Sequence, residues 1–153
     1  MINLDNIDRR ILTILQVDGR ISTVDLAEQV GLSPTATAER IKRLQKDRFI
    51  LGYVALLDPV KIDRALLVFV EVTLDKTTPD VFERFGAAAR RSADIIECHL
   101  VAGGFDYLIK TRVADMPAYR RLLGEAILSL PGVKETRTYA VMEEVKSSGA
   151  LPV

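Results

Sequence analysis

Apolar residues recur at helical spacing in three short stretches near the start of the chain, residues 5–16, 22–30 and 33–46. Each stretch has one apolar side and one polar side, which is typical of short helices that share a small core. The inward positions are Ile7, Ile11, Leu12, Leu15, Leu26, Ala27, Val30, Ile41 and Leu44. The pattern therefore predicts a compact three-helix unit.

The pattern changes after residue 48. Residues 49–57 are rich in β-forming side chains and are interrupted by Gly52, so we expect a short wing or connector strand there. Asp58-Pro59 is a turn signal that follows this segment. We therefore place a domain boundary at this point, with the three-helix module in residues 1–58 and a second domain in residues 59–153.

The second domain shows strands and helices in the order βαββαβ. The expected elements are a strand over 66–74, a helix over 78–91, strands over 95–102 and 105–113 joined by a glycine turn, a helix that ends at Pro131-Gly132, and a strand over 133–145. This order is that of the split βαβ, ferredoxin-like arrangement. The chain as a whole is predicted to be an α+β protein, with an N-terminal winged helix-turn-helix followed by the ferredoxin-like βαββαβ domain.

One face of such a sheet carries both helices, and the other face is open. The strand over 66–74 is apolar at alternate positions on both of its sides. We therefore expect the open face to be apolar and to be covered by self-association of the chain.

The helix pair over residues 22–46 carries clear start and stop signals. Ser22 stands at an N-cap position with Asp25 three residues later, and Gly31 can adopt the left-handed conformation that ends a helix. Ser33-Pro34 then restarts a helix as N-cap and first-turn proline. A tight helix pair of this length is how many proteins place a helix in the major groove of DNA.

The charge on the second of these helices supports the same interpretation. The whole chain is balanced, with 21 basic and 21 acidic residues, so affinity for nucleic acid must come from a local patch. Residues 33–46 contain four basic side chains and a single acid, Glu39. The candidate DNA-binding residues are Ser33, Pro34, Thr35, Thr37, Arg40, Lys42, Arg43 and Lys46. The alternative is an ordinary helix pair with a solvated basic face.

Other functional classes find little support in the residues. The adjacent pair Cys98 and His99 lies in an expected strand, where neighbouring side chains point to opposite faces, so no metal site is expected. We find no Ser/His/Asp set and no phosphate-binding loop with its lysine, so we expect no catalytic residues, no enzyme and no cofactor. The chain lacks a run of eighteen apolar residues and a signal-peptide pattern, so we expect a cytoplasmic, nucleoid-associated protein with no membrane partner.

Several motifs, in order along the chain, resemble those of the leucine-responsive regulatory protein (Lrp/AsnC, feast/famine) family. They are LDNIDRRILTILQVDGRIS, VGLSPT, RIKRLQKDRFILGY, HLVAGGFDYLIKTRV and LPGVKETRTYAVMEEVK, and together they span about residues 4–146. The resemblance implies a transcriptional regulator that binds double-stranded DNA and assembles as homodimers into higher oligomers, with an octamer as the expected form. Many relatives read Ser-Pro-Thr-Pro-Cys where this chain reads Ser33-Pro34-Thr35-Ala36-Thr37, so the target sequence is not carried over.

The resemblance also implies an amino-acid effector, with leucine as the expected one, and a pocket between dimers around the hairpin at residues 95–113. The positions that match are Leu100, Gly103, Gly104, Phe105, Asp106, Met116, Tyr139, Ala140 and Val141. Asp106 offers a carboxylate for the ligand ammonium and the glycines offer backbone amides for its carboxylate. Two alternatives stay open, namely a regulator that responds to another signal, such as proline or a branched-chain catabolite, and a stand-alone small-molecule-binding oligomer. Asp106 and the glycines could also form only a turn.

Overall fold

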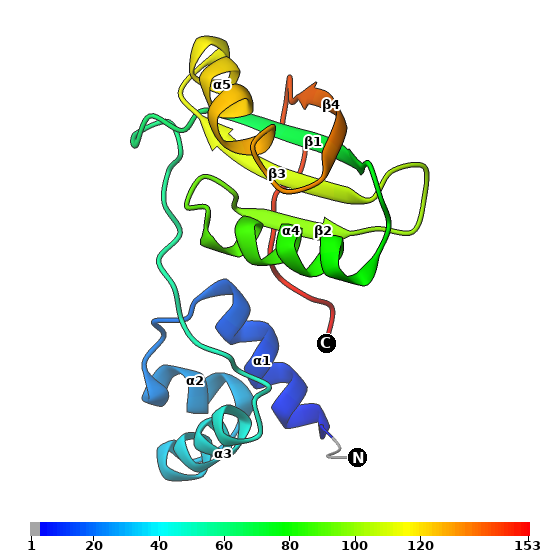
Figure 1. Cartoon of the computed structure of the whole chain (residues 1–153). Helices are drawn as coiled ribbons and strands as arrows, with labels where there is room; N and C mark the ends of the chain where they lie inside the picture. The colour runs from blue at the N-terminus through cyan, green and yellow to red at the C-terminus, as the bar shows by residue number, and fades with distance from the viewer. Residues whose placement is uncertain (1–3) are drawn as a thin grey trace. The chain divides into compact units, whose positions relative to one another are not determined.

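The computed structural model describes residues 4–153, which form two compact units (Figure 1). The first unit extends to Leu56 and also contains the tail Lys146–Val153, and the second unit is Leu57–Val145. The tail was expected in the second domain, but it joins the first unit because the Gln16 side chain bonds the Leu151 backbone. The Gln16 amide nitrogen donates to the Leu151 carbonyl at 3.0 Å, and the Leu151 N–H donates to the Gln16 oxygen at 2.6 Å.

The first unit consists of three helices, α1 (Asn6–Val17), α2 (Thr23–Val30) and α3 (Pro34–Lys46). Ser22 caps α2, Ser33 caps α3, and Gly31 ends α2 with a φ of 72° in the left-handed region, as the sequence predicts. The helices share a core made of Ile11, Leu12, Leu26, Val30 and Leu44. Short amphipathic helices of this length depend on such shared burial for their stability.

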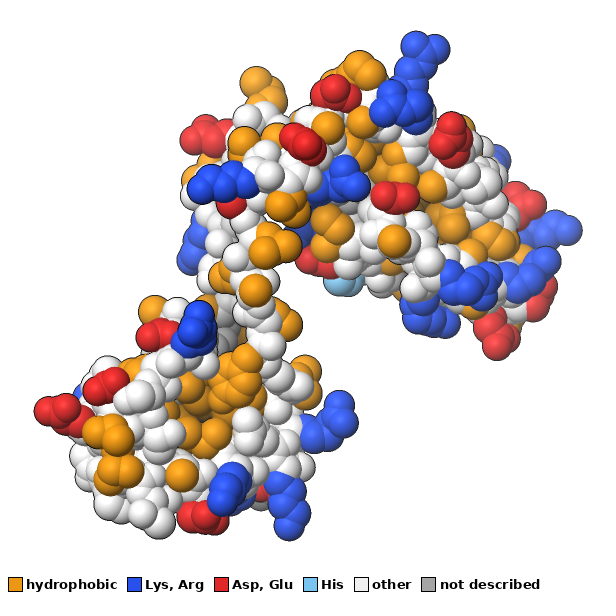
Figure 2. Space-filling view, turned by 90° about the vertical axis from the view of Figure 1, so that its left-hand side faces the viewer, with side chains coloured by type: hydrophobic (Ala, Val, Ile, Leu, Met, Phe, Trp, Pro, Cys, Tyr) orange, Lys and Arg blue, Asp and Glu red, His pale blue; other side chains and the backbone are white. Residues whose placement is uncertain are grey.

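The strand expected over residues 49–57 is not formed, and this prediction is wrong. The segment has no ladder partner in the described chain, and a strand needs a neighbour to pair its backbone groups. Its start is fixed because Phe49 N–H bonds the Leu44 carbonyl at 2.9 Å. After Ile50, the side chains of Leu51, Val54 and Leu56 are exposed. Figure 2 shows apolar side chains along the segment that joins the two units.

The second unit is a four-stranded antiparallel sheet with two helices on one face (Figure 1). Its elements are β1 (Leu66–Leu74), α4 (Pro79–Arg91), β2 (Glu97–Leu100), β3 (Tyr107–Val113), α5 (Met116–Leu122), the π-helical turn η1 (Leu123–Ile127) and β4 (Val133–Ala140). The strand order is β2-β3-β1-β4, so the ferredoxin-like prediction is confirmed. β2 and β4 are shorter than expected, and the second helix ends in a π-helical turn that sequence periodicity did not indicate.

The core of this unit lies between the sheet and its helices. Alternate β1 residues, from Val68 to Leu74, face the helices and are buried, and the Phe85 ring of α4 stacks on Tyr107 at 4.2 Å. Gly132, before β4, has a φ of 77°, and a Cβ there would lie 2.7 Å from the Val81 side chain. Only glycine fits this turn, because it combines left-handed backbone with close packing.

The open face of the sheet is less apolar than the sequence suggests. Phe69 of β1 has Lys110 of β3 on one side and Tyr139 of β4 on the other. Next to them the Tyr139 hydroxyl donates to the Glu71 carboxylate at 3.0 Å, and Lys110 pairs with Glu97 at 2.8 Å. The neighbouring strands thus supply charged partners for β1, so the face is a mixture of apolar and ionic groups. The expectation of an apolar face is corrected accordingly.

Candidate functional site

The α2–α3 pair presents one end and one side of α3 to solvent. Ser33 acts as the helix cap, since its hydroxyl accepts a hydrogen bond from the Ala36 N–H at 3.2 Å. Thr35 and Lys46 are exposed, and Lys46 has no ion-pair partner among residues 4–153. Lys42 pairs with Glu39 at 3.1 Å, but both side chains are mostly in water, so this pair is weak. These groups are available to an anionic partner.

Thr37 belongs to the packing of α3. Its side chain is fully buried, and its hydroxyl donates to the Ser33 carbonyl at 3.0 Å. A buried side chain cannot reach DNA, so we remove Thr37 from the candidate contacts. Ser33 and Pro34, by contrast, lie at the exposed N-terminal end of α3, where unpaired amides favour an anion.

Arg40 and Arg43 are held to the start of α1 by two carboxylates, Asp5 and Asp8, which were not among the predicted site residues. Asp8 of α1 is buried, with 1% of its surface exposed. Its two oxygens accept from Arg40 at 2.8 Å and from Arg43 at 2.5 Å, and Arg40 also bonds Asp5 at 2.7 Å. We call these four residues, Asp5, Asp8, Arg40 and Arg43, the α1–α3 brace.

The brace continues into the cap of α1. The Asp8 N–H donates to the Asp5 carboxylate at 2.7 Å, and the Asp8 carboxylate faces the Asp5 N–H at 3.4 Å. The hydrogen bond from the Asp8 N–H and the Arg40 guanidinium lower the pKa of Asp5, while the two carboxylates raise the pKa of Arg40. The same acids therefore begin α1 and hold α3 against it.

The two arginines of the brace differ in their exposure to solvent and in the number of carboxylates that they bond. The Arg40 side chain is 25% exposed and is held by both acids, so it acts as a clamp between helices. The Arg43 side chain is 48% exposed and bonds Asp8 through one nitrogen only. Arg43 thus keeps free donors on the solvent side, where a guanidinium can meet a phosphate or a base edge.

The residues expected to bind the effector fall into two groups at opposite ends of the sheet. Leu100 and the loop 103–106 lie beside the Leu74 end of β1, since the Asp106 N–H bonds the Val72 carbonyl at 3.0 Å. The second group lies at the Leu66 end of β1, where β4 ends and α5 begins; it consists of Met116, Tyr139, Ala140 and Val141. At about 3.3 Å per residue along β1, the Asp106 carboxylate at Leu74 lies roughly 16 Å from the level of Tyr139, which pairs with Phe69, and roughly 23 Å from that of Val141, which bonds Leu67.

Asp106 has a structural partner in the chain. Its Oδ2 accepts from the Leu74 N–H at 2.7 Å, where β1 ends. The bond continues the pairing of β1 with β3 for one step beyond the last ladder pair. The other carboxylate oxygen has no hydrogen bond among the described residues, so the group can hold the strand end and still accept from a ligand.

The exposed basic side of α3 is typical of a DNA-binding domain, and the helix-covered sheet forms a second domain that suits ligand binding. Together they indicate a ligand-responsive DNA-binding regulator, and comparison with known protein families agrees. Residues 4–45 match the AsnC-type helix-turn-helix domain, and residues 67–151 match the Lrp/AsnC ligand binding domain. The chain belongs to the Lrp/AsnC family of transcriptional regulators. Within the described residues, no helix is long and apolar enough to cross a membrane.

Similar proteins cover nearly the whole chain. It is 61% identical to the leucine-responsive regulatory protein of Salmonella typhimurium and 60% identical to that of Escherichia coli K12, over 99% of this chain and 92% of each relative. Among solved structures, a Neisseria meningitidis transcriptional regulator in complex with L-Met superposes with a TM-score of 0.93 at 33% identity, covering 98% of this chain and 97% of that one. An AsnC family regulator from Agrobacterium tumefaciens also gives 0.93 and 33%, with 97% of each chain covered.

Proposed function

We propose that the protein regulates transcription in response to leucine, which it binds in pockets shared between copies of the chain. The observation that carries this proposal is the identity of 60% or more with regulators named as leucine-responsive, across both domains. Because the Neisseria relative was solved with L-Met, methionine is the second candidate effector. A regulator of this kind acts on DNA, which would place it at the nucleoid in the cytoplasm.

The division of the effector residues into two groups supports a shared pocket. A free amino acid is shorter than the roughly 16–23 Å that β1 places between the Asp106 carboxylate and the second group. One copy would therefore supply the loop with Asp106, and another copy would supply the end of β4 with Met116. This requires at least a homodimer, and closed rings of dimers, such as an octamer, provide many equivalent pockets.

The loop provides the groups that an amino acid needs. The free oxygen of Asp106 would accept from the ligand ammonium, and the exposed backbone at Gly103 and Gly104 would donate to the ligand carboxylate. Met116 is exposed at the start of α5, where it could contact the aliphatic side chain.

Mixing two inactive variants tests the shared pocket. Asp106→Asn keeps an oxygen for the Leu74 N–H but turns an amide donor toward the ammonium, so leucine binding should weaken by about 1.5–3 kcal/mol in calorimetry. Met116→Lys should block the other half of the pocket. When the two variants are assembled together, a subset of pockets combines two intact halves, and tight leucine binding should return.

The mixing experiment has clear outcomes. Failure of the mixed assembly to bind, while each variant remains folded, would contradict a pocket built by two chains. Calorimetry with leucine, methionine and proline on the parent protein identifies the effector. Undiminished leucine binding by Asp106→Asn would leave Asp106 with its role at the strand end only.

On the DNA side, we propose that the N-terminal end of α3 enters the major groove. Ser33 and Thr35 would lie close to the bases or phosphates, and Lys42 and Lys46 would contact phosphates. Arg43 would leave Asp8 in part to reach the DNA, whereas Arg40 would stay as the clamp. A stand-alone ligand-binding protein is the alternative, and it would show no salt-dependent affinity for promoter DNA.

A further inference from the structure

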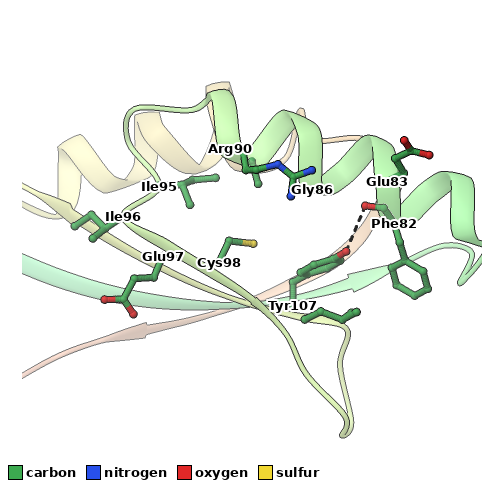
Figure 3. A pocket seen from close by; sticks show the side chains of 11 residues that line it. Phe82, Glu83, Gly86, Arg90, Ile95, Ile96, Glu97, Cys98 and Tyr107 are labelled. Atoms are coloured by element: carbon green, nitrogen blue, oxygen red, sulfur yellow. Dashed lines mark hydrogen bonds between the residues drawn. The ribbon is translucent and has the colours of Figure 1, made fainter. Parts of the chain in front are cut away.

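A pocket opens between α4 and the edge strand β2, on the helix-covered side of the sheet (Figure 3). Its volume is about 600 Å³, which lies within the range of small-molecule sites. Cys98 and Tyr107 form its floor, and Ile95 and Leu100 line it further. Apart from Leu100, it shares no residue with the proposed effector pocket, and it lies within one chain.

One cation reaches into this pocket. The Arg90 guanidinium folds back along α4, so that its nitrogens lie 3.6 and 3.7 Å from where a Cβ on Gly86 would be. Among residues 4–153, it has neither an ion-pair nor a hydrogen-bond partner. Burial raises the pKa of the Cys98 thiol on the pocket floor, and the positive charge of Arg90 partly opposes this rise. An unpaired guanidinium above an apolar floor is suited to a carboxylate.

Gly86 keeps this space open. It lies within α4, where a glycine costs stability relative to any ordinary helix former. An added Cβ would meet only the Arg90 guanidinium, at ordinary contact distances, so tight packing does not explain the glycine. A larger residue at this position would instead project into the pocket.

We propose that this pocket binds a small aliphatic carboxylate, with its carboxylate on Arg90 and its hydrocarbon body over Cys98, Tyr107 and Ile95. The geometry favours a ligand without an ammonium group. Glu83 and Glu97 also line the pocket. Figure 3 shows that the Glu83 carboxylate points away from Cys98 and Tyr107, so it lies at the margin of the pocket. Glu97 is engaged by Lys110 at 2.8 Å and faces His99 at 3.2 Å. A simple or 2-oxo carboxylic acid therefore fits better than the amino acid of the same skeleton.

The single cysteine of the chain offers a direct probe, since Cys98 lies on the pocket floor. The probe ligand is isocaproate, which has the carbon skeleton and carboxylate of leucine but no amino group. We would measure the rate at which neutral iodoacetamide alkylates Cys98 in the full-length protein as the isocaproate concentration increases. By mass action, the rate should fall roughly tenfold at a ligand concentration ten times its dissociation constant. The neutral isostere isocaproamide, which keeps the shape and loses the charge, should protect far less.

Two variants of lining residues and one control variant test whether the protection arises in the pocket. Arg90→Gln should abolish the protection by isocaproate, whereas the matched Arg91→Gln, on the same helix but outside the lining, should keep it. Gly86→Leu should fill the pocket, remove the effect of isocaproate and leave thermal stability equal or higher. Leucine should protect less than isocaproate, and any protection by leucine that survives Arg90→Gln arises elsewhere in the protein.

Three results would overturn the proposal. Equal protection by isocaproate and isocaproamide would make the site purely apolar. Protection by isocaproate that persists in Arg90→Gln would place the carboxylate on another group. Alkylation that is already suppressed without ligand, in proportion to protein concentration, would mean that a second copy covers the pocket.

Discussion

Asp8→Asn is the substitution that tests the α1–α3 brace most directly. Asn has nearly the same shape as Asp, so the cap of α1 and the packing around residue 8 are disturbed little. The change removes the negative charge that Arg40 and Arg43 share, and it replaces one acceptor oxygen by a donor. The two arginines then face an amide that can accept from only one of them.

The expected cost follows from the exposure of the partners. Breaking a buried ion pair usually costs about 3–5 kcal/mol, because the remaining charge is left buried. Here the remaining charges are Arg40 and Arg43, which are 25% and 48% exposed and can recover water, so we expect about 2 kcal/mol. For a unit of this size that corresponds to a fall of roughly 8–16 °C in the melting temperature of the helical unit.

Thermal unfolding followed by circular dichroism, together with hydrogen exchange of the α1–α3 amides, measures this effect unit by unit. Glu28→Gln is the control, because it also removes one negative charge from α2 in the same unit but Glu28 has no ion pair in the described structure. The freed Arg43 should also strengthen non-specific DNA binding and steepen its salt dependence. A stability change below about 0.5 kcal/mol in Asp8→Asn, equal to that of the control, would refute the brace.

Lys46→Ala should weaken binding to all DNA sequences alike and reduce the salt slope by about 0.9 in a fluorescence titration, and an unchanged slope would exclude Lys46 as a phosphate contact. The pKa of Asp5 is lowered from its ordinary value of 3.8. The ionised carboxylate therefore stabilises the folded state fully above pH 3.8. This stabilisation is lost as the pH falls through the lower pKa of the folded state. Asp5→Asn can still cap α1 but lacks the titrating carboxylate, so the stability of its helical unit should fall less between neutral and acid pH than that of the parent. An acid transition identical to that of the parent would contradict this.

Local signals in the sequence were reliable where the structure depends on near neighbours. Ser22, Gly31 and Ser33 begin and end helices as expected, because a cap involves residues only three or four positions apart. β1 matches the expected strand over 66–74, since its β-branched run is buried. The expected strand over 49–57 failed because β-forming residues give no ladder without a partner.

The site could be predicted only in part. The basic residues of α3 were visible in the sequence, but their partner Asp8 lies 32 and 35 positions away from Arg40 and Arg43, and nothing local links them. Asp8 lies in the first turn of α1, where acidic residues are common because they favour the positive end of the helix dipole. The α4–β2 pocket was also not predicted, because it depends on how Gly86 and the Arg90 side chain meet an edge strand.

The bond between Gln16 and Leu151 has a consequence for how the chain can be divided. Because Lys146–Val153 belongs with the helices, the sheet unit is in effect an insertion within the helical unit, and the polypeptide passes between the two units twice. A fragment that stops at residue 56 would lack the segment that Gln16 binds. Any isolated DNA-binding fragment should therefore include this tail, joined by a short linker in place of residues 57–145.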